Sequence, residues 1–81
     1  MKEESVEIGD IIKVEMIYDE NEIEEEIYKL VSHKANIHAE ISEITTASPL
    51  GTAIYKKKIG EQVSYQVNDN TFTLLIKEKI Q

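Results

Sequence analysis

The chain has 81 residues and a net charge of −7, which suits one small domain with a modest hydrophobic core. It contains no cysteine, so disulfides, thiolate metal sites and cysteine nucleophiles are excluded. Its acidity disfavours direct nucleic-acid binding, because carboxylates repel a phosphate backbone. The sequence shows neither a membrane-length apolar run nor a signal-peptide core, so we expect a cytoplasmic protein with no membrane association.

The charge is unevenly distributed along the chain. Residues 1–31 hold eleven acidic residues and three lysines, which gives −8, whereas residues 32–81 hold five acidic residues and six lysines, which gives +1. The acidic half could meet a basic surface of another protein. The alternative, favoured on base rates, is a solvated face that keeps the domain soluble.

The first third of the chain predicts a frayed start followed by an antiparallel hairpin. Residues 1–7 are polar and are expected to be frayed or to be the stub of something longer. Residues 11–18 alternate between apolar and polar, which is typical of a half-buried strand. Residues 22–31 fit both a helix and a strand, but the short polar tip at 19–21 favours a second strand. The first strand is expected to bury one face, made of Ile12, Val14, Met16 and Tyr18.

The rest of the chain predicts three more strands around one helix. A connection over residues 32–39, with room for a short turn of helix, leads to a short β-branched strand over residues 41–46. Residues 62–67 and 71–80 alternate in hydrophobicity on either side of a turn at 68–70, which predicts a second hairpin. No linker or repeat divides the chain, so one domain is expected over residues 1–81. Apolar side chains share one face on each strand of this hairpin: Val63, Tyr65 and Val67 on the first strand, and Phe72, Leu74 and Ile76 on the second.

Residues 48–60, SPLGTAIYKKKIG, carry the sequence signature of a short helix. Ser48 is expected to be the N-cap, and Pro49 suits the first helical position. The lysines at 56–58 would complement the C-terminal end of the helix dipole, and Gly60 would take the left-handed conformation that ends the helix. A helix this short needs a sheet to cover. Its apolar residues share one face: Leu50, Ala53 and Ile54.

The polar residues form no pattern typical of a metal site or a catalytic triad. His33 and His38 have no carboxylate at zinc-site spacing, so surface histidines are expected. The glutamates at 24–26 would alternate between the two faces of a strand, which prevents one calcium cage. Ser42, Ser48 and Ser64 lack the neighbouring His and Asp of a triad. We therefore predict no catalytic residues, no metal site, no cofactor and no small-molecule substrate.

Three blocks of sequence, in order, carry a resemblance to a known family. They are YKLV at 28–31, SPLG at 48–51 followed by Ala-Ile at 53–54, and IGEQV at 59–63, with Ile-Gly-Asp at 8–10 as a weaker match. Together they resemble the C-terminal domain of the Gre transcript-cleavage factors over residues 6–80. The resemblance implies an FKBP-like α+β fold, with a twisted, mainly antiparallel five-stranded sheet and one short helix.

The resemblance also implies a function. In Gre factors an N-terminal coiled coil enters the secondary channel of bacterial RNA polymerase and presents acidic residues that help to hold a catalytic magnesium. The C-terminal domain docks the factor on the polymerase rim. This chain resembles only that docking domain, so we expect a polymerase-binding module in which the coiled coil is absent. The docking residues that the resemblance implies are Ser48, Pro49, Leu50 and Gly51; relatives often have an acidic residue in place of Ala47.

Two other functions are weighed against this one. An FKBP-like peptidyl-prolyl isomerase needs an aromatic-lined pocket for proline, and a chain with no Trp and one Phe has little to build it from. The third possibility is a generic interaction domain with an unrelated partner.

Overall fold

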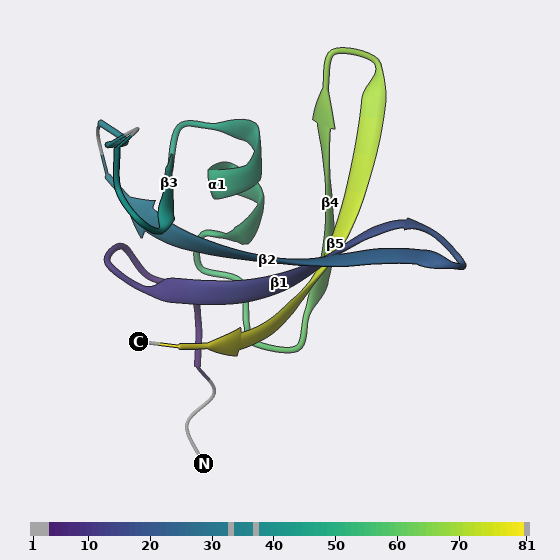
Figure 1. Ribbon diagram of the computed structural model, residues 1–81, viewed down its shortest axis with the longest axis horizontal. Coiled ribbons are helices and arrows are strands. Elements are labelled where there is room, and N and C mark those ends of the chain that lie inside the picture. The colour runs from purple at the N-terminus through teal and green to yellow at the C-terminus, as the bar shows by residue number, and fades with distance from the viewer. Residues whose placement is uncertain (1–3, 33, 37, 81) are drawn as a thin grey trace.

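The computed structural model describes residues 4–32, 34–36 and 38–80 (Figure 1). Five strands form one curled sheet, and a short helix crosses one of its faces. The elements are β1 (Ile11–Asp19), β2 (Glu22–Val31), β3 (Ser42–Thr45), α1 (Pro49–Ile54), β4 (Gln62–Val67) and β5 (Asn70–Lys79). The strand order is β3-β2-β1-β5-β4, and every neighbouring pair is antiparallel except the parallel pair β2 and β3. This architecture confirms the predicted α+β fold class.

The ambiguous segment over residues 22–31 is a strand, as predicted. β2 pairs with β1 from Ile11 opposite Lys29 to Ile17 opposite Ile23. At the tip, the Asp19 carboxylate accepts a hydrogen bond of 2.7 Å from the backbone N–H of Asn21. The short turn brings residues 22–31 beside β1, which supplies hydrogen-bond partners for their backbone N–H and carbonyl groups. This pairing outweighs the helical spacing of the apolar residues.

One face of the sheet forms the hydrophobic core. The face of β1 that was predicted to be buried is confirmed at Val14, which is fully buried, but Tyr18 at its end is 48% exposed. On β5 the shared apolar face also enters the core, since Leu74 is fully buried. On β2 the structure buries Leu30 and leaves Ile23 and Ile27 on the outer face, 52% and 41% exposed. In the described part of the chain, no helix combines the length and apolarity needed to cross a membrane. The buried apolar side chains are Val6, Ile12, Val14, Met16, Leu30, Ile54, Val63, Leu74 and Ile76.

Helix α1 ends earlier than the sequence predicts. It stops at Ile54, and Tyr55 is an extended C-cap residue, so the lysines at 56–58 lie beyond the helix. Lys56, with a φ of 68°, takes the left-handed position that was expected of Gly60. Gly60 has a φ of 95°, but it lies in the turn that leads into β4. The predicted dipole role of the lysines is therefore wrong, as is the predicted stop at Gly60.

The early helix stop has a tertiary cause in residues 4–10, which we call the N-terminal strap. The backbone N–H of Lys56 donates to the carbonyl of Val6 at 2.8 Å, and the N–H of Val6 donates to the carbonyl of Lys57 at 2.8 Å. Ser5 forms an isolated β-bridge with Lys58. Val6 is fully buried, so the expectation of a frayed start is wrong for residues 4–7. The backbone N–H of Lys56 is therefore bonded to the strap, whereas in a longer helix it would have been bonded to a carbonyl one turn earlier in α1.

Candidate docking loop

The four predicted docking residues lie where α1 begins: Ser48 is its N-cap, and Pro49, Leu50 and Gly51 form its first turn. We call this segment, with Ala47 before it, the docking loop. Of the four, Pro49 is exposed, Ser48 and Leu50 are partly buried, and Gly51 is buried. Ala47, just before them, is also exposed. Pro49 and Ala47 are therefore the residues of this loop that a partner would meet first, whereas Ser48 and Gly51 are placed to shape it.

Ser48 fixes the loop by using both hydrogen-bonding functions of its hydroxyl. It is the N-cap, with φ −77° and ψ 157°, and its Oγ accepts from the backbone N–H of Gly51 at 3.1 Å. The same hydroxyl donates to the carbonyl of Thr45 at 2.8 Å. The predicted cap is confirmed, and the second bond ties the start of α1 to the end of β3. A hydroxyl has a single proton, and that of Ser48 is already donated to Thr45. Ser48 therefore has no further proton to donate to a partner.

Gly51 allows α1 to lie directly against the end of β3. A Cβ at this position would overlap the carbonyl oxygen of Thr45, and would lie 2.7 Å from its carbonyl carbon and 3.0 Å from the Ser48 Oγ. Thr52 adds a further tie, since its Oγ1 donates to the carbonyl of Thr46 at 2.8 Å. The loop is thus held by side-chain bonds at three points, and its close approach to β3 excludes any side chain at Gly51.

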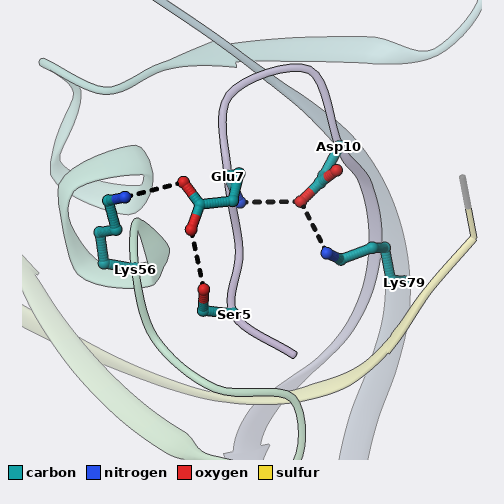
Figure 2. Close-up of polar contacts among 5 residues, drawn as sticks. All are labelled: Ser5, Glu7, Asp10, Lys56 and Lys79. Atoms are coloured by element: carbon teal, nitrogen blue, oxygen red, sulfur yellow. Dashed lines mark hydrogen bonds and ion pairs between the residues drawn. The ribbon is translucent and has the colours of Figure 1, made fainter. Parts of the chain in front are cut away.

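The strap holds the other end of α1 through a polar network (Figure 2). The Glu7 carboxylate binds Lys56 Nζ at 2.9 Å and accepts from the Ser5 hydroxyl at 2.8 Å. Asp10 accepts from the backbone N–H of Glu7 at 2.8 Å and pairs with Lys79 at 3.1 Å. The bonds from Lys56 and Ser5 lower the pKa of Glu7, and Glu7 in turn raises the pKa of Lys56. The network links the end of α1, the strap and β5.

The sequence gives no sign of this network, because Glu7 and Lys56 are 49 residues apart. The glutamates at 24–26 alternate between faces as predicted, since Glu24 and Glu26 lie opposite core residues of β1 and Glu25 lies opposite Glu15. His38 is exposed, and His33 lies outside the described residues. Within the described ranges there is no pocket and no group of three or more His, Asp or Glu residues that could hold a metal ion.

Comparison with known proteins supports the resemblance. A family model described as "Transcription elongation factor, GreA/GreB, C-term" matches residues 1–79. A structure of the transcription factor Gfh1 superposes with a TM-score of 0.79 at 22% identity, over 96% of this chain and 49% of that one. GreA factor homolog 1 (Gfh1) of Thermus thermophilus gives 0.76 at 21% identity, over 99% and 51%. Gfh1 of Thermus aquaticus gives 0.78 at 19% identity, over 96% and 49%.

These likenesses show a shared fold, and this chain spans about half the length of each of those structures. No curated protein sequence matches the chain.

Proposed function

The chain belongs to the GreA/GreB C-terminal domain family of transcription elongation factors, and on that premise we propose that it is a module that binds bacterial RNA polymerase in the cytoplasm. The observation that carries the proposal is the family match over residues 1–79. The proposed contact is the loop of Ser48, Pro49, Leu50 and Gly51, on the rim of the polymerase secondary channel.

The geometry of the loop supports this contact. Pro49 and Ala47 are exposed, and the bonds that Ser48 makes to Thr45 and Gly51 hold them in place. A loop that is already held loses less conformational entropy when it binds, so more of the contact energy appears as affinity. Ala47 replaces the acidic residue that relatives often have, so this chain would bind without that charge.

We further propose that the 81-residue chain contributes no catalytic residue of its own. In Gre factors, by the resemblance, cleavage depends on carboxylates that a long coiled coil carries into the channel. The described body measures 35 × 31 × 20 Å along its principal axes, so a domain that docks on the rim stays far from a reaction centre deep in the enzyme.

The test is the affinity of this chain for bacterial core RNA polymerase. We expect the parent to bind and Pro49→Ala to bind about fivefold or more weakly, since an apolar contact is lost from a desolvated loop. Val67→Ala is a matched control, because it trims an exposed apolar side chain on β4, away from the loop, and should leave affinity unchanged. Ala47→Asp should strengthen binding.

Failure of the parent to bind would overturn the proposed function, and equal binding by Pro49→Ala would move the contact elsewhere. The same samples test catalysis, because the chain should not stimulate RNA cleavage in a backtracked transcription complex. Cleavage on its addition alone would contradict the proposal of a non-catalytic module.

A further inference from the structure

The core face of the sheet continues beyond the helix. α1 packs mainly against β3 and β4, and the β1–β2 hairpin extends away from it (Figure 1). On that hairpin Glu24 lies opposite Met16, and Glu26 lies opposite Val14. Two carboxylates therefore occupy the core-facing side of β2, while Ile23 and Ile27 lie on its outer side. If this part of the hairpin were an ordinary solvated surface, the isoleucines would be expected on the core-facing side and the carboxylates on the outer side.

Aromatic side chains surround these two carboxylates. Tyr65 of β4 stacks on Phe72 of β5, with ring centroids 5.3 Å apart. Tyr18 of β1 lies on the same face of its strand as Met16, which is opposite Glu24, and it is close enough to Glu24, Glu26 and Tyr65 to interact with them electrostatically. Tyr28 of β2 interacts in the same way with Tyr65, Tyr18 and Glu26. We call this surface, contributed by four strands, the tyrosine face: Tyr18, Glu24, Glu26, Tyr28, Tyr65 and Phe72.

The tyrosine face is negatively charged and its phenols are protonated at neutral pH. Partial desolvation raises the pKa of Tyr18, Tyr28 and Tyr65, and Glu24 and Glu26 raise the pKa of Tyr18 further. None of the ion pairs found in the described residues uses Glu24 or Glu26. Those pairs join Lys13 to Glu78, Lys56 to Glu7, Lys77 to Glu15 and Lys79 to Asp10.

We propose that the tyrosine face binds an arginine-bearing segment of a partner protein. A guanidinium group stacks on phenol rings and forms paired hydrogen bonds with a carboxylate, and this surface presents both groups side by side. Charge complementarity selects a cationic occupant, since Glu24 and Glu26 have no lysine partner among the described ion pairs. This proposal does not depend on the docking loop, because no residue of the loop takes part in it.

A protein segment suits the shape of this face. Tyr18 is 48% exposed, and the tips of the β1–β2 and β4–β5 hairpins diverge (Figure 1), so a small ligand would remain largely in water. A nucleic acid would bring phosphates against two carboxylates, which is unfavourable. Arginine is expected to be preferred over lysine, whose ammonium is a strongly hydrated point charge and stacks less well on a ring.

The test uses two terminally blocked peptides, one of alternating arginine and glycine and one of alternating lysine and glycine, and follows amide and tyrosine-ring signals by NMR. We expect the arginine peptide to bind about threefold or more tightly than the lysine peptide, and to shift Tyr18, Tyr28 and Tyr65. The double variant E24Q/E26Q should lose about tenfold in affinity for it. Tyr18→Leu, at a half-exposed site, should lose severalfold, and a thermal melt of each variant checks that the fold is kept.

The matched control is the double variant E20Q/E25Q, which removes the same charge from the hairpin tip and from the outer face of β2. It should bind the arginine peptide as the parent does, apart from a small salt-dependent loss. Equal losses in the two double variants, equal affinity for the two peptides, shifts confined to the outer face, or no binding at millimolar peptide would each overturn the proposal. Saturable binding of a single-stranded RNA oligonucleotide to this face would overturn it as well.

Discussion

Replacing Gly51 by alanine tests the contact on which the docking loop is built. Gly51 lies within α1, where alanine is the better helix former by about 1 kcal/mol, so helix propensity alone predicts a more stable protein. The structure predicts the opposite. The added methyl group would overlap the carbonyl oxygen of Thr45 and press on the Ser48 Oγ, and neither the backbone of β3 nor the capping hydroxyl can move without breaking bonds.

The size of the effect follows from these contacts. Overpacking against backbone costs up to about 3 kcal/mol, and disturbing the Ser48 cap costs about 1 kcal/mol more. The gain in helix propensity offsets about 1 kcal/mol, so the net loss is about 3 kcal/mol. An 81-residue domain has roughly 4–12 kcal/mol of stability in total. At about 4–8 °C per kcal/mol, the melting temperature should fall by roughly 12–24 °C.

The assay is urea unfolding monitored by circular dichroism, and Gly9→Ala is the control variant. Gly9 has a φ of 99° and nothing within 4 Å of an added Cβ, so alanine there costs only the backbone strain, about 1–2 kcal/mol. Gly51→Ala should cost more, although its backbone conformation is ordinary for alanine. A Gly51→Ala protein as stable as the parent, or more stable, would show that α1 does not lie against Thr45 in this way.

Two further predictions concern the two ends of α1. Ser48→Ala removes both bonds of the capping hydroxyl and should lower the free energy of unfolding by about 1–2 kcal/mol, measured by urea unfolding. Ser48→Thr keeps a hydroxyl and should lower it much less. Equal losses in the two variants would contradict the double role of Ser48. At the other end, the lowered pKa of Glu7 means that its bonds stabilise the fold above the ordinary carboxyl pKa of about 4.5, and that this contribution is lost as the pH falls through the lowered folded value. The difference in free energy of unfolding between the parent and Glu7→Gln should therefore be constant near neutral pH and shrink on acidification below about pH 4.5. A difference that does not change with pH would rule out an ionised Glu7 as its source.

The tyrosine face and the outer face of β2 show where sequence periodicity reaches its limit. In residues 22–31 the isoleucines at 23 and 27 suggest one buried side and the pair Tyr28 and Leu30 suggests the other. The structure buries the second side near α1 and leaves both isoleucines exposed. Which side of β2 is covered depends on where α1 and the second hairpin lie, and those elements are distant in sequence.

Local signals, by contrast, predicted much of the fold. The faces of β1, β4 and β5 and the cap at Ser48 depend on residues a few positions apart, so alternation and capping chemistry were enough to find them. The docking loop was predicted only by family resemblance, and its role in binding stays a prediction. The reason for glycine in it came from the structure, because the carbonyl that a Cβ would strike belongs to Thr45 at the end of β3.

The sequence by itself determined where the strands run, which apolar side chains share a face on β1, β4 and β5, and where α1 begins. Only the tertiary structure decided where α1 ends, because Lys56 leaves the helix to pair with Val6 and Glu7 of the N-terminal strap. It also decided that β3 runs parallel to β2 and that three tyrosines from three strands gather around two carboxylates. Each of these features depends on contacts between residues far apart in the chain, and a local pattern carries no record of such contacts.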